Sequence, residues 1–155
     1  MFWPVVWDCN NNEVDDYGYI YTVVDGIRYA LKDGEAIIMQ SKNITSVNIP
    51  SSITYNSVSY LITSICGGAL SACDLTDIVI PISVAVIGGY AFEGCDNLTS
   101  VYYGGTAEDW ANIAIGTYNE DLTNATRYYY VENEVDVPQD GGNYWHYVDG
   151  VPTAW

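Results

Sequence analysis

The sequence has very few positive charges. Four Lys or Arg residues stand against twenty Asp or Glu residues in a chain of 155, which gives a formal net charge of −16 at pH 7. Such a negative surface repels nucleic-acid phosphates and anionic lipid headgroups. We therefore expect no nucleic acid and no anionic membrane surface among the partners. The acidity by itself indicates solubility more than it indicates a basic partner.

Long hydrophobic runs are also lacking. No stretch approaches the roughly 18 apolar residues of a membrane-spanning helix, so we expect no membrane insertion by this segment. Met1 is followed by Phe2-Trp3-Pro4 without the basic region and apolar run of a secretory signal peptide. A Pro-x-x-Trp phrase lies near both ends, at Pro4–Trp7 and Pro152–Trp155. Because such a phrase is typical of a recurring module boundary, we expect this sequence to be part of a longer protein.

Residue patterns for catalysis and metal binding are sparse. His146 is the single histidine and lies between Trp145 and Tyr147, with no nucleophile-elbow motif elsewhere. We interpret it as a packed or surface strand residue. No C-x-x-C or Cys/His spacing suits zinc, no Lys follows the paired glycines as in a phosphate loop, and the acidic pairs lack calcium-loop spacing. The sequence predicts no enzyme activity, no cofactor and no metal.

The sequence does contain internal repeats. The segment 65–74 (ICGGALSACD) returns as 87–96 (IGGYAFEGCD), at a constant offset (87 − 65) of 22 positions. A second phrase recurs three times, as ITSVNIP at 44–50, LTDIVIP at 75–81 and LTSVYYG at 98–104. A period of twenty to thirty residues with this apolar spacing is typical of a leucine-rich repeat solenoid. We predict an α/β solenoid with a short parallel β-sheet and compact helical or irregular turns on the other face.

We expect this chain to have four parts. They are an N-terminal β-meander cap (1–43), the leucine-rich repeats (44–106), a C-terminal cap of helix and strand (107–131), and a linker with an aromatic terminal hairpin (132–155). Caps are expected because the end repeats of a stack otherwise expose an apolar face.

Local signals support these parts. Asp25-Gly26 and Asp33-Gly34 between strand-like runs predict hairpins. Thr106 followed by acidic residues predicts a short helix at 106–114, and the alternating stretch 54–60 predicts a small inserted hairpin. We expect Gly88 and Gly94 to permit sharp turns.

The sequence contains four cysteines, which could be free thiols, disulfides or metal ligands. Cys73 and Cys95 occupy the same slot of successive repeats, each after an Ala-Leu or Ala-Phe core pair. Because free Cys packs as a small apolar residue, we favour buried thiols over a disulfide or a metal pair. Cys9 lies in a predicted loop without a recognisable partner.

The predicted strands present a strip of outward-facing side chains, because side chains alternate along a strand. A solvated sheet face is one reading of this mixed strip, and a ligand-binding surface is the other. The strip consists of Ser46, Asn48, Asp77, Val79, Ser100 and Tyr102.

The C-terminal tail is rich in aromatic residues. Tyr144, Trp145, Tyr147 and Trp155 would be costly to leave in water, and a lone two-stranded hairpin is marginally stable. We expect 143–155 to dock, either on its own domain near the N-terminal meander or on a neighbouring molecule by self-association.

The residues 75–95, LTDIVIPISVAVIGGYAFEGC, resemble the BspA-like leucine-rich repeats, also called the Treponema pallidum type. They match the pattern L-T-x-I-x-I-P-x-S-V-x-x-I-G-x-x-A-F-x-G-C at every defining position. The preceding turn departs from it at Cys66, where the pattern has Gly, and at Leu70, where it has Phe. The resemblance implies a secreted or cell-surface protein of a bacterium or parasite. It also implies adhesion to host or microbial proteins, with no catalytic motif.

From the residues and the resemblance together we expect a non-enzymatic protein-binding or adhesion module. The alternative is a spacer or stalk attached to an enzyme or a carbohydrate-binding domain outside this sequence.

Overall fold

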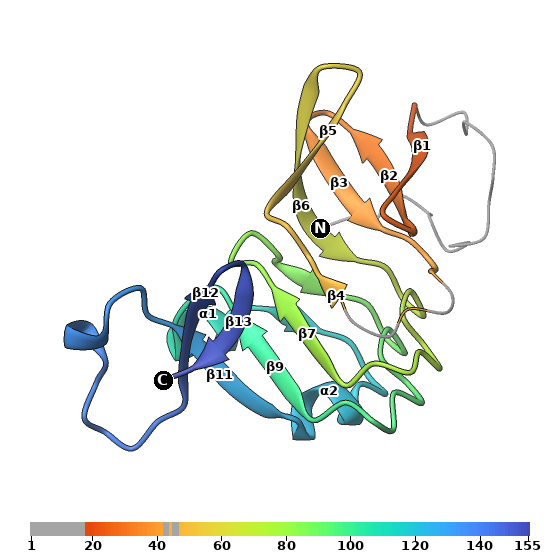
Figure 1. The fold of residues 1–155 in the computed structure, drawn as a ribbon. Coiled ribbons are helices and arrows are strands. Elements are labelled where there is room, and N and C mark those ends of the chain that lie inside the picture. The colour runs from red at the N-terminus through yellow and green to blue at the C-terminus, as the bar shows by residue number, and fades with distance from the viewer. Residues whose placement is uncertain (1–17, 42–43, 45–46) are drawn as a thin grey trace.

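The computed structural model of the chain describes residues 18–41, 44 and 47–155. Within them, strands form two sheets that face each other across the repeat region (Figure 1). The repeat sheet runs in the order β13-β12-β11-β9-β7-β4, and the mixed sheet runs β1-β2-β3-β6-β8-β10 with β5 paired to β6.

The repeat sheet comprises β4 (Val47–Asn48), β7 (Asp77–Ile80), β9 (Ser100–Tyr103), β11 (Thr126–Tyr130), β12 (Tyr144–Val148) and β13 (Val151–Ala154). The mixed sheet comprises β1 (Ile20–Val24), β2 (Ile27–Lys32), β3 (Glu35–Ile38), β5 (Ser52–Tyr55), β6 (Val58–Ile65), β8 (Val86–Ile87) and β10 (Ala114–Ile115). The helices are α1 (Ala107–Ala111), α2 (Glu120–Asn124) and the 3-10 turn η1 (Glu134–Asp136).

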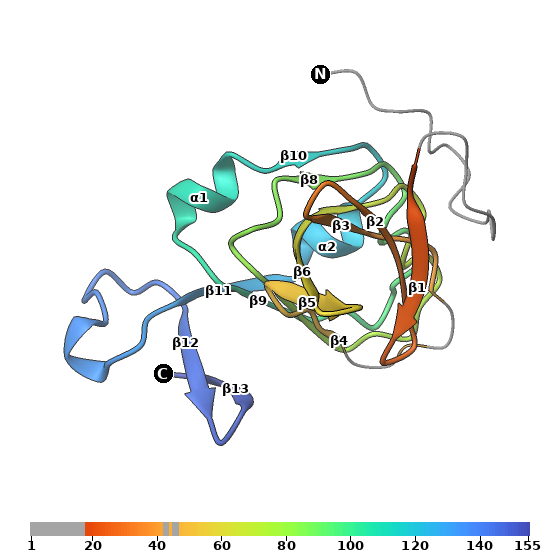
Figure 2. The same cartoon turned by 90° about the horizontal axis from the view of Figure 1, so that it is seen from above.

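Between β4 and β11 the chain passes back and forth between the two sheets. β4, β7, β9 and β11 pair in parallel in the repeat sheet, and β6, β8 and β10 pair in parallel in the mixed sheet. The predicted parallel pairing of the strands within 75–81 and 98–103 is confirmed, with Ile78 opposite Val101. The parallel pairing of β6, β8 and β10 was not predicted, since the sequence predicted only compact helical or irregular turns on that side. Figure 2 shows the two ladders on opposite sides of the core.

The recurring apolar positions fill the space between the sheets. Leu75, Ile78, Ile80 and Val101 are completely buried in one cluster that also contains Phe92 from a turn and Leu122 from α2. Burial of this kind is worth about 1.5–3 kcal/mol per large aliphatic or aromatic side chain. The residues that recur with the repeat period are therefore residues that form the core.

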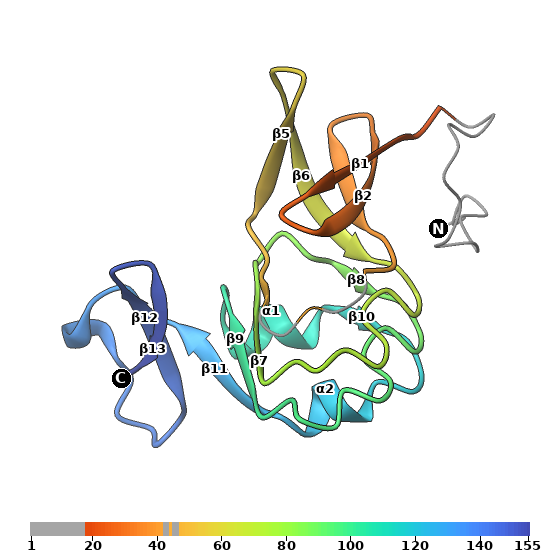
Figure 3. The same ribbon diagram turned by 45° about the vertical axis from the view of Figure 1, so that its right-hand side comes forward.

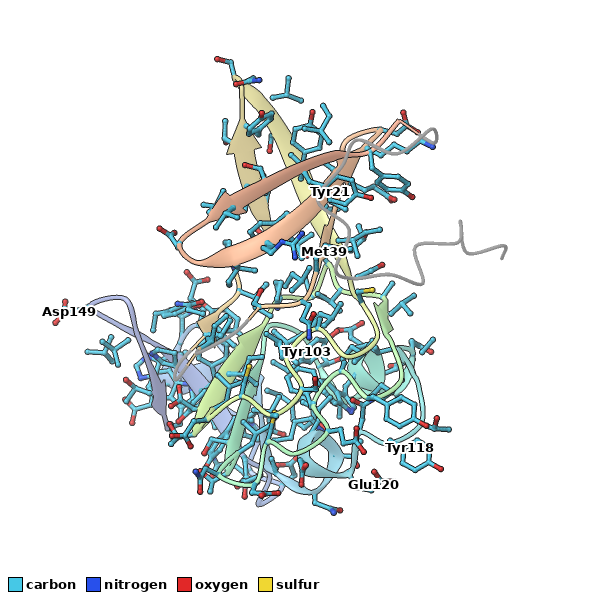
Figure 4. The ribbon with its side chains drawn as sticks, turned by 90° about the vertical axis from the view of Figure 1, so that its right-hand side faces the viewer. Tyr21, Met39, Tyr103, Tyr118, Glu120 and Asp149 are labelled. Atoms are coloured by element: carbon cyan, nitrogen blue, oxygen red, sulfur yellow. The ribbon has the colours of Figure 1, made fainter. Side chains whose placement is uncertain are left out.

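The N-terminal hairpins join the same core. β1, β2 and β3 are antiparallel around Asp25-Gly26 and Asp33-Gly34, as predicted, and β3 pairs in parallel with β6. Tyr29, Leu31 and Met39 are buried in the cluster that holds the repeat residues. Figure 3 shows these hairpins standing above the repeats, and Figure 4 shows Met39 where the two parts meet.

The predicted hairpin within 54–60 is confirmed as β5 and β6. Its turn is Asn56-Ser57, both at positive φ (48° and 64°). This is the geometry of the two-residue turns that suit the twist of a hairpin.

Helix α1 begins where the sequence predicts but ends earlier. The Thr106 hydroxyl accepts a hydrogen bond from the Asp109 amide at 3.1 Å, and the Asp109 carboxylate accepts one from the Thr106 amide at 2.9 Å. This is a capping box. The predicted end at 114 is wrong, because Ala114–Ile115 form β10 and pair with Val86–Ile87.

The two equivalent cysteines are free and buried, as predicted. The Cys95 thiol donates to the Leu70 carbonyl oxygen at 3.2 Å, and burial raises the pKa of Cys95 to about 11. Burial also raises the pKa of Cys73. Cys66, which departs from the repeat pattern in the sequence, is disulfide-bonded. Cys9 lies outside the described residues.

The two turn glycines are needed for different reasons. Gly94 has φ +73°, a backbone region that L residues rarely adopt. Gly88 is needed for space instead, since a Cβ there would lie 2.6 Å from the Gly67 Cα of the preceding turn. Successive turns therefore touch backbone to backbone at this position.

Phe92→Ala should lower the free energy of unfolding by about 3–5 kcal/mol, because the ring is fully buried. The neighbouring Glu93→Ala should change it by less than about 0.5 kcal/mol, because that side chain is exposed. Urea denaturation of both variants measures the contrast. Equal midpoints for the two variants would contradict the inward orientation of Phe92.

Gly88→Ala should cost about 1–3 kcal/mol, since its methyl group would overlap the backbone of the preceding turn. Gly67→Ala is the matched control. Its Cβ would lie 3.1 Å from the Gly89 carbonyl oxygen and 3.9 Å from the Gly89 amide nitrogen, so its cost should be smaller. Thermal unfolding of the two variants gives the comparison, and a larger loss for Gly67→Ala would mean that the turns are spaced differently.

Candidate binding groove on the outer face of the repeat sheet

A row of side chains crosses the outer face of the repeat sheet. The registers place Asn48 opposite Val79, Val79 opposite Tyr102 and Tyr102 opposite Tyr128. The residues next to them in sequence, such as Ile78 and Val101, belong to the interior cluster. Because side chains alternate along a strand, this row faces away from the core.

The terminal hairpin β12–β13 packs across this row. The Trp145 ring lies 5.5 Å from Tyr102 and 4.9 Å from Tyr147, measured between centroids. Its indole N–H donates to the Tyr103 carbonyl oxygen at 2.7 Å. At the edge strand β4, the Tyr147 hydroxyl donates to the Asn48 side-chain oxygen at 3.2 Å. Figure 2 shows the hairpin on the side of the repeat sheet that faces away from β8 and β10.

The packing of the hairpin buries Val79. The sequence predicted it as an exposed strip residue, but it is only 4% exposed. It is buried without belonging to the interior cluster, as is Trp145. The two residues therefore lie in a second, smaller apolar layer on the outer face, and Val79 is not available to a ligand.

The tail docks in a different place from the one predicted near the N-terminal meander. Its hairpin, formed around Asp149-Gly150, lies on the outer face of its own repeat sheet. The aromatic residues of 143–155, together with Tyr102 and Tyr128 on the strands, are the one sequence signal for docking at this place. A contact between residues 99 positions apart leaves no local pattern.

Four residues of the predicted strip line a groove of about 510 Å³ between the sheet and the tip of the hairpin. They are Asn48, Asp77, Ser100 and Tyr102. The sheet contributes the residues at the amino ends of β7 and β9 together with Tyr102 and Asn48, and the hairpin contributes its turn. The lining residues are Asn48, Thr76, Asp77, Thr99, Ser100, Tyr102, Gly150, Val151 and Pro152. Ser46, the remaining predicted strip residue, lies outside the described residues.

The groove combines apolar surface with several hydrogen-bonding groups. Thr76 donates its hydroxyl proton to the Asp77 carboxylate at 2.8 Å, and Thr99 donates to the Thr76 carbonyl oxygen at 3.1 Å. Burial, followed by the proximity of Tyr128 and Asp77, raises the pKa of Tyr102. The Tyr102 hydroxyl therefore stays protonated at neutral pH and can donate a hydrogen bond.

His146 and the thiols of Cys73 and Cys95 each have a partner within the described part of the chain. His146 stacks on Trp155 at 3.6 Å between ring centroids, and the thiols of Cys73 and Cys95 donate to backbone carbonyl oxygens. Across residues 18–41, 44 and 47–155, His, Cys, Asp and Glu nowhere gather in threes that could hold a metal ion. The same residues contain no helix long and apolar enough to cross a membrane.

Comparison with known families agrees with the repeat pattern. Residues 63–115 match the model of the BspA type leucine rich repeat region. The chain carries a BspA-type leucine-rich repeat region. The match covers β7, β8, β9, α1, β10 and the last three residues of β6. The strands β7 and β9, which shape the groove, therefore lie within it. Among curated proteins, no sequence matches the chain.

Among the solved structures that resemble it are two leucine-rich repeat proteins. One is a leucine rich cell surface protein from Faecalibacterium prausnitzii A2-165, with 22% identity and a TM-score of 0.56 over 70% of this chain. The chain spans only 30% of that protein's length. The other is a leucine-rich repeat protein from Bacteroides capillosus ATCC 29799, with 26% identity, a TM-score of 0.50, and coverage of 54% of this chain and 70% of the other. These similarities establish a leucine-rich repeat fold.

Trp145→Ala should release the hairpin from the sheet, because Trp145 is 1% exposed and contacts three aromatic rings. A loss of about 3 kcal/mol corresponds to a rise of roughly a hundredfold in the hydrogen-exchange rate of the amides pairing β12 with β13. Amides between β7 and β9 should keep their protection.

Tyr147→Phe is the control for this variant. It removes one exposed hydrogen bond and should cost less than about 1 kcal/mol. Unchanged exchange in Trp145→Ala would mean that the ring does not hold the hairpin.

Proposed function

We propose that this chain is a non-enzymatic protein-binding module of a secreted or cell-surface protein, and that the groove beside Asp77, Ser100 and Tyr102 contacts its partner. The observation that carries the proposal is the groove itself. It presents a carboxylate, hydroxyls and an amide from successive repeat strands beside the apolar Val151 and Pro152. A partly apolar surface with a few fixed polar groups is the kind of surface that recognises other proteins.

The charge of the chain favours a neutral or basic partner segment. The formal net charge is −16, and Asp77 is an acidic residue in the groove. Opposite charge on the partner would raise the association rate and would help to exclude acidic proteins. Adhesion to a host or microbial surface protein is the form of binding that we propose.

Two observations support an extracellular location. One neighbour in structure is described as a cell surface protein. Cys66 is disulfide-bonded, and disulfides persist mainly in oxidising compartments.

A spacer role is the alternative. It is favoured by the hairpin, which covers Val79 and much of the outer face and so reduces the surface open to a partner. In that case the groove would contact nothing, and activity would belong to a domain outside this sequence.

The test is surface plasmon resonance of the immobilised chain against purified extracellular-matrix proteins and mucins. Asp77→Lys combined with Ser100→Lys places charge and bulk in the groove, and it should weaken binding at least tenfold, about 1.4 kcal/mol. Both side chains are partly exposed, so the fold should survive.

Tyr118→Ala is the matched control, because this residue is 53% exposed and lies on the side of the molecule opposite the hairpin tip at Asp149 (Figure 4). Its binding should equal that of the unmodified chain. Binding to none of these proteins, or equal binding by the groove variant, would favour the spacer role.

A further inference from the structure

A second hollow lies beside the terminal hairpin. It has a volume of about 300 Å³ and shares no lining residue with the groove described above. Its walls come from β11, from the segment 132–143 and from both ends of the hairpin. The lining residues are Tyr128, Glu134, Val137, Gln139, Gly142, Asn143, Tyr144 and Trp155.

Three aromatic rings in this hollow are held in place by contacts outside it. Trp155 stacks on His146 with an interplanar angle of 13°, and its indole N–H donates to the Val131 carbonyl oxygen at 2.9 Å. The Tyr144 hydroxyl donates to the Asp140 carboxylate at 2.8 Å. Tyr128 stacks on Tyr102 at 5.1 Å. The rings are therefore fixed before any ligand arrives, which lowers the entropy cost of binding.

Planar polar groups stand beside these rings. Within the described part of the chain, the side chains of Glu134 and Asn143 make no hydrogen bond, and Gln139 uses only its amide nitrogen, which donates to the Val137 carbonyl oxygen at 3.2 Å. A carboxylate accepts hydrogen bonds in its plane, and a side-chain amide both accepts and donates them in its plane. They suit a ligand with several neighbouring hydroxyls.

We propose that this hollow binds a neutral saccharide unit of a glycan. A pyranose ring has an apolar face of C–H groups that packs on an aromatic ring, and its rim of hydroxyls matches planar amides and a carboxylate. An anionic ligand is disfavoured, because no Lys or Arg lines the hollow and the chain is strongly acidic. A cation is less suited than a saccharide, because Glu134 is the one charged lining residue, beside the two amides Gln139 and Asn143.

This site shares no lining residue with the groove proposed for protein binding, although Tyr128 of the hollow stacks on Tyr102 of the groove. It uses the rings of Tyr128, Tyr144 and Trp155 in place of the hydroxyls beside Asp77. A result at one site therefore leaves the other proposal standing.

The test is titration of the isotopically labelled chain with cellotetraose, laminaritetraose, maltotetraose and chitotetraose, followed by NMR. At least one should bind with a dissociation constant below about 10 mM and shift the indole N–H signal of Trp155. Trp155→Ala and Asn143→Ala should each weaken that binding at least tenfold. Asn143→Ala keeps all three rings, so it separates loss of contact from loss of the hairpin.

Two further variants sharpen the result. Tyr118→Ala, an exposed ring on the opposite side of the molecule, should bind as the unmodified chain does. Glu134→Gln keeps a planar hydrogen-bonding group but removes the one charge that lines the hollow, so it tests whether a cation binds there.

Three outcomes would overturn the proposal. The first is that none of the four tetrasaccharides binds. The second is that the Trp155 and Asn143 variants bind as well as the unmodified chain. The third is that tetramethylammonium binds in place of the saccharides and is lost in Glu134→Gln, which would identify a cation site.

Discussion

The close backbone contact between successive repeats is the constraint on which the rest of the structure depends. Gly88 rests on Gly67, and Gly116 rests on Gly89, with no space for a side chain between them. Amides of one turn donate to carbonyl oxygens of the next, as from Leu70 to Ala91 at 2.9 Å. This spacing matches the roughly 4.8 Å between paired strands, so turns and strands of neighbouring repeats can stay in register together.

The same register is kept where the repeat sequence becomes irregular. At the turn before α2, the Asn119 side-chain oxygen accepts the hydrogen bond from the Phe92 amide at 3.0 Å. Its side-chain amide donates to the carbonyl oxygens of Gly88 and Gly116. A buried amide side chain thus takes over the role that the backbone has in the preceding turn. The chain can then begin a helix without leaving a buried polar group unpaired.

The features predicted from sequence are those set by local or repeated patterns. Asp25-Gly26 and the Thr106 capping box act over a few residues, and the positions of Ile78 and Val101 recur at a fixed period. The ladder of β8 and β10 was missed because a two-residue strand such as Val86–Ile87 is too short to show alternation. For the groove, alternation identified Asn48, Asp77, Ser100 and Tyr102, while the covering of Val79 depends on a distant hairpin that no local pattern reveals.

The hydrogen bond from Tyr147 to Asn48 joins the last hairpin to the first strand of the repeat sheet, across 99 positions of sequence. The surface that receives the hairpin exists only after β4, β7 and β9 have paired. Contacts of such separation form late in folding, because the intervening chain must first be ordered. We therefore expect docking of Trp145 to be the closing step of folding, so that its fluorescence would report whether the whole stack of repeats is assembled.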